Sequence, residues 1–272
     1  MIAETRVHNG LDEQFAALKR NGELALVMYQ TAGSPTRETT IAWAPLLERA
    51  GASILELGIP FSDPLGDGPT VQRASQQALD GGMTVSGALE TAAAISAQVA
   101  IPVVLMTYCN PVFRMGTERF AQRAAAAGVS AVIVPDLPIE ESAELASHLS
   151  AHAVHLIYML SPTSTEERIT RTAAAASGFI YCMAVTGVTG ARTDLATGLP
   201  AFLQRVRALT DVPLVVGFGI SRPEHIRALA GLADGVVVAS ALIDLVDRTE
   251  PEGREAAIEH FVRELRASCS VS

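Results

Sequence analysis

A closed (β/α)8 barrel of the α/β class is the fold that the sequence predicts, with an extra helix before the first strand and a helix at the C-terminal end. Three observations predict it. Short apolar runs recur eight times, each run is continuous rather than alternating, and most gaps between runs can hold a helix. Continuous apolar runs are typical of parallel strands buried on both faces, which helical crossovers connect. Eight such units close a TIM barrel.

The eight predicted strands follow one another at intervals along the whole chain of 272 residues. No linker or change of composition divides the chain, so we expect a single domain over residues 1–272. An open, doubly wound sheet with the same order of elements is the alternative. The predicted strands cover residues 24–29, 53–57, 103–106, 131–134, 154–159, 179–182, 214–216 and 235–238.

Caps and stop residues delimit the helices that lie between these strands. Pro35 and Thr36 open a helix that reaches Ala50, and Gly51 closes it. Proline is favoured in the first turn of a helix, and glycine is favoured just after the last one. Further helices are predicted at about 11–20, 118–127, 222–230 and 253–267, and Gly128 and Gly231 close the second and third of these.

Composition argues against several classes of protein. The chain is 49% hydrophobic and 18% charged, which excludes intrinsic disorder. Its three cysteines, an odd number, indicate reduced thiols in a cytoplasmic protein rather than a disulfide scaffold. A net charge of −9 disfavours nucleic acid as a partner. Charges throughout the first twenty residues leave no signal-peptide core, and no stretch is apolar enough for a membrane span.

Lysine and histidine have unfavourable positions for catalysis in such a barrel, whose working groups lie at the C-terminal ends of the strands. Lys19, the only lysine, lies before the first strand. Schiff-base chemistry needs a lysine amine, so a lysine-dependent aldolase is not expected. His148 and His152 are spaced i, i+4, and His155 begins the fifth strand. We expect structural or surface roles for all three and no metal site.

Two carboxylates are the candidates for acid–base catalysis. Glu56 interrupts the buried second strand near its C-terminal end. A buried carboxylate is costly unless it is paired or used, so an ion pair inside the barrel is the alternative. Low-dielectric surroundings should raise the pKa of Glu56. The next loop, residues 58–69, is rich in proline and glycine and places Asp67 near the barrel mouth. Two carboxylates in different surroundings tend to divide acid and base roles.

Small residues follow the last three predicted strands. Residues 217–221 follow strand seven, and residues 239–241 follow strand eight and open a helix. The loops after strands seven and eight are the usual phosphate site of this fold, where glycines and a helix N-terminus favour an anion. Ordinary tight turns are the alternative. Residues 186–190, after strand six, could close as a lid and add Gly190 to the phosphate site.

Five segments of the chain resemble the tryptophan synthase alpha subunit family. They are residues 55–70, 106–112, 134–141, 186–190 and 217–221. The resemblance implies a lyase of L-tryptophan biosynthesis that cleaves indole-3-glycerol phosphate to indole and glyceraldehyde 3-phosphate. The implied reaction is a retro-aldol cleavage by acid–base chemistry that needs no cofactor.

The same resemblance implies roles for individual residues. Glu56 would protonate the indole ring carbon and assist loss of the glycerol hydroxyl proton. Asp67 would hold the indole N–H, and Tyr181 would contact Glu56 or the substrate. Substrate contacts would come from Tyr29, Met106, Tyr108, Ile133, Thr189 and Phe218, and phosphate contacts from Gly190, Gly219, Ala239 and Ser240.

A partner is also implied: a beta subunit that condenses indole with serine, uses pyridoxal phosphate and completes an alpha2-beta2 tetramer. Ser34 stands where the family usually has aspartate, and it favours the alternative of a stand-alone indole-3-glycerol-phosphate lyase. A non-catalytic phosphate-binding barrel is another alternative. So is a sugar-phosphate isomerase, which would not explain the segment from Glu56 to Asp67. Contacts to the beta subunit would fall on Asp63, Pro64, Asn110, Asp136 and Pro138.

Overall fold

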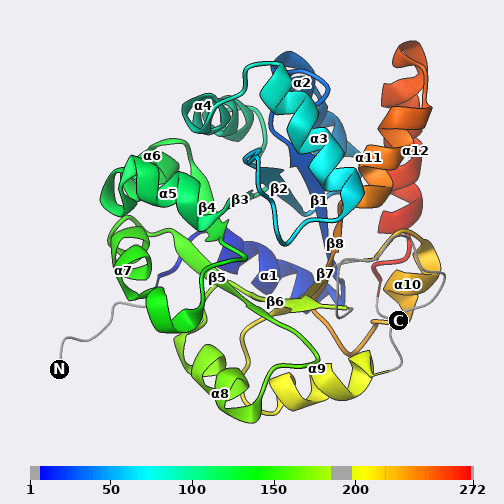
Figure 1. Ribbon diagram of the computed structural model, residues 1–272. Coiled ribbons are helices and arrows are strands. Elements are labelled where there is room, and N and C mark those ends of the chain that lie inside the picture. The colour runs from blue at the N-terminus through cyan, green and yellow to red at the C-terminus, as the bar shows by residue number, and fades with distance from the viewer. Residues whose placement is uncertain (1–6, 185–197, 218, 271–272) are drawn as a thin grey trace.

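A computed structural model describes residues 7–184, 198–217 and 219–270. Within it, eight strands form a closed barrel in chain order, each parallel to the next, and β8 pairs with β1 (Figure 1). The predicted barrel is confirmed, and the open doubly wound sheet is excluded. The strands are β1 (Ala25–Thr31), β2 (Ile54–Gly58), β3 (Val103–Met106), β4 (Val129–Ile133), β5 (His155–Leu160), β6 (Ile180–Met183), β7 (Leu214–Gly217) and β8 (Gly235–Val238).

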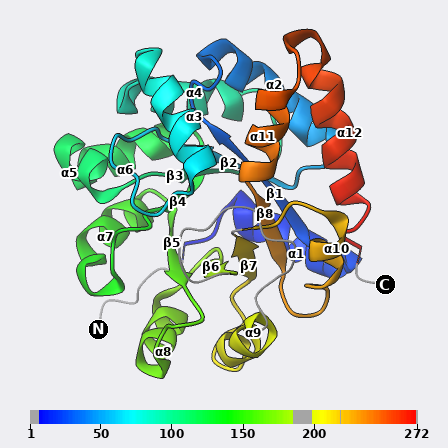
Figure 2. The same ribbon diagram turned by 45° about the vertical axis from the view of Figure 1, so that its right-hand side comes forward.

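Helices surround the barrel on its outside, as the two views show (Figures 1 and 2). The extra N-terminal and C-terminal helices are both present as α1 and α12. The helices are α1 (Gly10–Asn21), α2 (Arg37–Ala50), α3 (Pro69–Asp80), α4 (Val85–Ser96), α5 (Cys109–Met115), α6 (Thr117–Ala126), η1 (Ile139–Glu141), α7 (Ala143–Ala151), α8 (Glu166–Ala175), α9 (Leu199–Arg207), α10 (Pro223–Arg227), α11 (Ser240–Arg248), η2 (Pro251–Gly253) and α12 (Arg254–Arg266).

Local sequence signals account for both ends of α2. Thr36 caps α2 by accepting a hydrogen bond from the Thr39 backbone N–H at 3.1 Å, and Gly51 ends it in the left-handed region. The predicted helix over 222–230 is wrong in length, because α10 ends at Arg227. Beyond it the Leu229 N–H donates three residues back, to Ile226, which tightens the chain into turns instead of continuing the α-helix.

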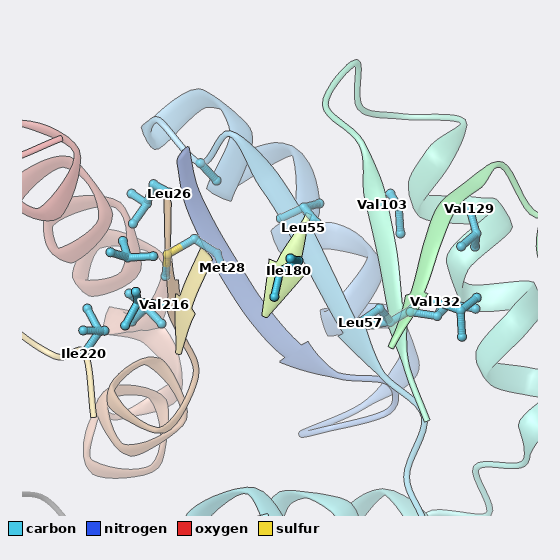
Figure 3. Close-up of a cluster of buried hydrophobic side chains, with 14 of the residues drawn as sticks. Leu26, Met28, Leu55, Leu57, Val103, Val129, Val132, Ile180, Val216 and Ile220 are labelled. Atoms are coloured by element: carbon cyan, nitrogen blue, oxygen red, sulfur yellow. The ribbon is translucent and has the colours of Figure 1, made fainter. Parts of the chain in front are cut away.

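Closure of the barrel sorts successive strand residues into two apolar layers. In β1, Leu26 and Met28 pack outward against the helices, in the cluster drawn in Figure 3. Val27 faces the interior, together with Ile54 of β2 and Val104 of β3. Since both faces of each strand are covered, the strand sequences are mostly apolar.

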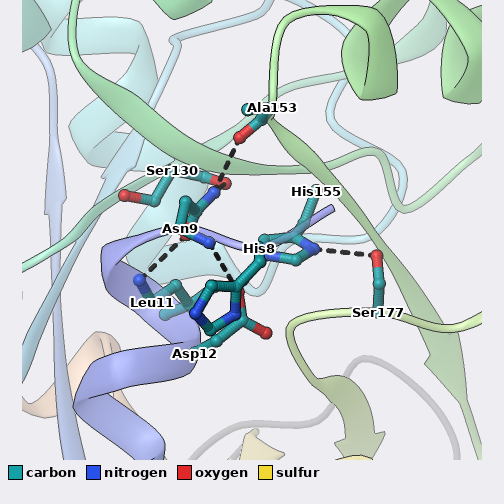
Figure 4. A network of polar contacts seen from close by, with 8 residues as sticks. All are labelled: His8, Asn9, Leu11, Asp12, Ser130, Ala153, His155 and Ser177. Atoms are coloured by element: carbon teal, nitrogen blue, oxygen red, sulfur yellow. Dashed lines mark hydrogen bonds and ion pairs between the residues drawn. The ribbon is translucent and has the colours of Figure 1, made fainter. Parts of the chain in front are cut away.

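Helix α1 covers one end of the barrel. Its Phe15 belongs to the interior cluster, and polar contacts fix its first turn (Figure 4). Asn9 donates to the carbonyl oxygens of Ser130 and Ala153, at 2.9 and 2.8 Å. The fully buried His155 bridges Asp12 and Ser177, with both contacts at 2.8 Å. His155 therefore has a structural role at the N-terminal end of the strands, as predicted.

The described helices contain no segment that is both long and apolar enough to cross a membrane.

Candidate active site

Glu56 lies inside the barrel, in register with Tyr29 of β1 and Val104 of β3. Only 2% of its surface is exposed, and its Oε2 atom has no hydrogen-bond partner among the described residues. Burial, and then the nearby Asp67, raises the pKa of Glu56 to about 8. The carboxyl group therefore keeps its proton at neutral pH and faces a cavity without an ion-pair partner among those residues. This arrangement suits a group that must give and take a proton.

Asp67 lines the same cavity from the loop between β2 and α3. Its surface is 6% exposed. Its backbone N–H donates to the Pro64 carbonyl at 3.2 Å, and its own carbonyl accepts from the Gln72 side-chain amide at 2.9 Å. Burial raises the pKa of Asp67 to about 6, while a hydrogen bond from Tyr108 opposes this rise. Near pH 7 the site thus combines a protonated Glu56 with an ionised Asp67.

Two buried tyrosines, Tyr29 and Tyr181, line the cavity beside these carboxyl groups. Each ring has room only because a glycine lies beside it. A Cβ at Gly58 would collide with the Tyr29 hydroxyl, and one at Gly217 would collide with the Tyr181 hydroxyl. Burial raises the pKa of both phenols, and Glu56 and Asp67 raise them further. Both tyrosines are therefore neutral hydroxyl groups at the site.

Three of the four predicted phosphate-binding residues, Gly219, Ala239 and Ser240, also line this cavity. Gly219 has a φ of +91°, which a glycine adopts without strain. Ala239 precedes α11 directly, and Ser240 is its first residue. The α11 N-terminus therefore presents free backbone N–H groups to the cavity, a favourable environment for an anion. Thr189, Gly190 and Phe218 lie outside the described residues.

Three other predicted substrate residues differ in position. Met106 lines the cavity. Ile133 is buried in the interior cluster that contains Tyr181, against which Met106 also packs. Tyr108 is buried beside the loop that carries Asp67, and it is not among the described residues that line the cavity.

Sequence analysis missed a polar link between α3 and α11. Thr70 lines the cavity and donates a hydrogen bond to Asp244, another lining residue, at 3.0 Å. Arg73 donates to the same carboxylate at 3.1 Å. Asp244 is four residues after Ser240 and therefore shares its face of α11, a spacing that could have indicated it. The link joins the helix after the Asp67 loop to the helix of the candidate phosphate site.

The predicted partner contacts lie in the segments that follow the adjacent strands β2, β3 and β4, where Asn110 belongs to α5 and the other four lie in loops. Two large apolar side chains that sequence analysis missed lie near them: Leu65 is 82% exposed and Phe113 is 54% exposed. Of the five predicted contact residues, the exposed ones are Asp63, Asn110 and Asp136, and the partly buried ones are Pro64 and Pro138.

Two polar residues in β1 and in the loop after it have different surroundings. Ser34 donates a hydrogen bond to the Gln77 side chain of α3 at 2.7 Å, so it ties the loop after β1 to that helix. Gln30 is buried on β1, and its Oε1 atom has no hydrogen-bond partner among the described residues. Across the same residues, no group of three histidine, cysteine or acidic side chains is arranged to hold a metal ion.

Comparison with known proteins decides the family. The family model of the tryptophan synthase alpha chain matches residues 15–270. The chain belongs to the tryptophan synthase alpha chain family. It is 50% identical to the tryptophan synthase alpha chain of Chloroflexus aggregans over 258 residues, which cover 94% of this chain and 97% of that protein. It is 49% identical to the alpha chain of Roseiflexus sp. strain RS-1, over 93% of this chain and 98% of the relative.

Solved structures agree with this assignment. Mycobacterium tuberculosis tryptophan synthase superposes with a TM-score of 0.89 at 35% identity, covering 96% of this chain and 98% of the other. Tryptophan synthase subunit alpha of Legionella pneumophila superposes with a TM-score of 0.87 at 33% identity, covering 96% and 98%. The alpha chain family supplies the lyase that cleaves indole-3-glycerol phosphate in tryptophan biosynthesis, and an alpha chain implies a beta-subunit partner.

Proposed function

We propose that Glu56 and Asp67 perform this cleavage by proton transfer alone. Glu56 gives its proton to the indole ring carbon that bears the glycerol chain. As a carboxylate, it then takes the proton of the adjacent glycerol hydroxyl. The carbon–carbon bond breaks, its electron pair returns to the ring, and the products are indole and glyceraldehyde 3-phosphate. Glu56 ends the cycle protonated.

The observation that carries this proposal is the buried Glu56 carboxyl group, which faces a cavity that Asp67 also lines and has no partner for its Oε2 atom among the described residues. Asp67, ionised near pH 7, accepts the indole N–H and stabilises the positive charge that ring protonation creates. Tyr181 contacts Glu56 or the substrate. Tyr29, Met106, Ile133 and Phe218 surround the indole ring, Thr189 orders Asp67, and Gly190, Gly219, Ala239 and Ser240 bind the phosphate.

The pH profile of kcat is expected to be bell-shaped. Below about pH 6, Asp67 gains a proton and no longer accepts the indole N–H, so activity falls. Above about pH 8, Glu56 loses the proton that it must donate, so activity falls again. Indole release measured from about pH 5 to about pH 10 tests this expectation. A profile that stays flat across that range would contradict the assignment of both groups.

We further propose that a beta subunit docks over Asp63, Pro64, Asn110, Asp136 and Pro138 to form an alpha2-beta2 tetramer in the cytoplasm. Pyridoxal phosphate would be bound by that partner, and the alpha chain would work without a cofactor. The exposed Leu65 and Phe113 extend this contact surface with apolar area.

An indole-release assay on indole-3-glycerol phosphate, with and without the cognate beta subunit, tests both proposals. We expect slow turnover by the alpha chain alone and a large increase on mixing, because docking orders the loops at the barrel mouth. Fast turnover that the beta subunit leaves unchanged would instead favour the stand-alone lyase, for which Ser34 is the motivating residue. No indole under either condition would favour the non-catalytic phosphate-binding barrel.

A further inference from the structure

Tyr108 is one of the residues for which the family resemblance implies a substrate contact. It follows β3, directly precedes α5, and is 2% exposed. The described residues that line the substrate cavity do not include it. Its side chain lies instead against the loop between β2 and α3. These contacts suit a role that Tyr108 exerts through that loop.

The Tyr108 side chain contacts this loop at three residues. Its ring stacks on Phe61, with the ring centres 5.4 Å apart and an interplanar angle of 29°. Its hydroxyl oxygen accepts a hydrogen bond from the Gly66 backbone N–H at 3.2 Å. Asp67 follows Gly66 directly, and hydrogen bonding from the same hydroxyl lowers the pKa of its carboxyl group, because a phenol donates and a carboxylate can only accept. One hydroxyl group thus holds the loop backbone next to the acidic side chain.

We propose that Tyr108 is a positioning residue for the lyase reaction, because it holds the loop at Phe61 and at the Gly66 backbone and thereby positions the adjacent Asp67 carboxylate at the cavity. The proposal rests on the function proposed above. The hydrogen bonds of Asp67 with Pro64 and Gln72 hold its main chain and do not involve its carboxyl group. Gly66 lies beside the Tyr108 hydroxyl, because a Cβ built there would be 3.4 Å from it, an ordinary van der Waals distance.

Besides holding the loop, the Tyr108 hydroxyl has an electrostatic effect on Asp67. A hydrogen bond donated to a carboxylate favours its ionised form. The Tyr108 hydrogen bond lowers the pKa of Asp67 against the larger effect of burial. Without the hydroxyl, the Asp67 pKa is expected to rise, and less of the carboxylate would be ionised at neutral pH.

Tyr108→Phe is the decisive variant, because it removes the hydroxyl and keeps the ring that stacks on Phe61. We expect kcat to fall about tenfold at neutral pH, as for loss of a hydrogen bond to a charged group. We also expect the acidic limb of the pH profile to move to higher pH. Tyr158→Phe is the matched control: Tyr158 is also buried, its hydroxyl bonds Ser142 at 3.0 Å, and it does not line the cavity. The kcat and the pH profile of Tyr158→Phe should equal those of the parent.

Two further measurements separate the possible outcomes. The ¹³C titration of the Asp67 carboxyl carbon, assigned with Asp67→Asn, reports its pKa without any need for activity. An Asp67 pKa that is the same in Tyr108→Phe and in the parent would overturn the proposal. In the Asp67→Asn background, Tyr108→Phe should cost little further activity, because both changes act through one group; independent, additive losses would also overturn it. If the parent cleaves no indole-3-glycerol phosphate, the proposed function fails, while the titration still tests the contact.

Discussion

Glu56→Gln is expected to lower kcat for indole release by about 10²–10⁴, the usual cost of losing a general acid–base group. The amide resembles the protonated carboxyl group in size and can donate hydrogen bonds, but it cannot transfer a proton to the ring and take one back. Binding of the substrate should change little, because the loss falls on the chemical step. Steady-state indole release at neutral pH gives the comparison. Glu90→Gln is the control, an exposed position on α4 that should keep parental activity.

The same substitution is expected to stabilise the fold at alkaline pH. The pKa of Glu56 is raised to about 8 in the folded protein from 4.5 in the unfolded chain. Between these values the folded state holds a proton that the unfolded state has lost, so the stability of the parent falls as the pH rises. The amide of the variant does not titrate. We therefore subtract the free energy of unfolding of the parent from that of the variant at each pH. This difference should be larger at pH 8 than at pH 4.5.

Urea unfolding at these two pH values measures the difference. A variant that keeps near-parental turnover would refute the acid–base role of Glu56. A variant that loses activity and is less stable at the higher pH would show that the carboxylate is structurally paired rather than held for catalysis.

Asp67→Asn is expected to lower kcat by about 10²–10⁴ as well, because a neutral amide does not stabilise the positive charge of the protonated indole ring. The pH profile should also change shape. The acidic limb near pH 6 should disappear, since Asp67 causes it. The alkaline limb should move to lower pH, because the charge of Asp67 contributes to the raised pKa of Glu56.

Asp80→Asn is the matched control for this prediction. Asp80 is an exposed residue at the end of α3, accepts a hydrogen bond from Gln76, and does not line the cavity. It should leave both limbs in place. If Asp67→Asn retained the parental acidic limb, another group would be responsible for it, and the electrostatic role of Asp67 would fail.

The order of the elements and the position of Glu56 followed from local sequence. Each strand is a short, continuous apolar run, and such runs are typical of strands with both faces buried. A single acid within one of them therefore stood out, because an unused carboxylate there would cost stability. Thr36 and Gly51 delimited α2 through contacts within a few residues of each helix end. Signals of this kind need no knowledge of the rest of the chain.

Only the tertiary structure decided which face of each strand points inward. A continuous apolar run has no alternation, so nothing local distinguishes Tyr29, which lines the cavity, from Gln30 beside it. The pairing of β1 with β2 and β8 sets that direction, and it places Glu56 toward the cavity. The hydrogen bond from the Gly66 backbone N–H to Tyr108 likewise joins residues that follow different strands. Such contacts depend on closure of the whole barrel, because packing between distant segments rather than local propensity brings these side chains together.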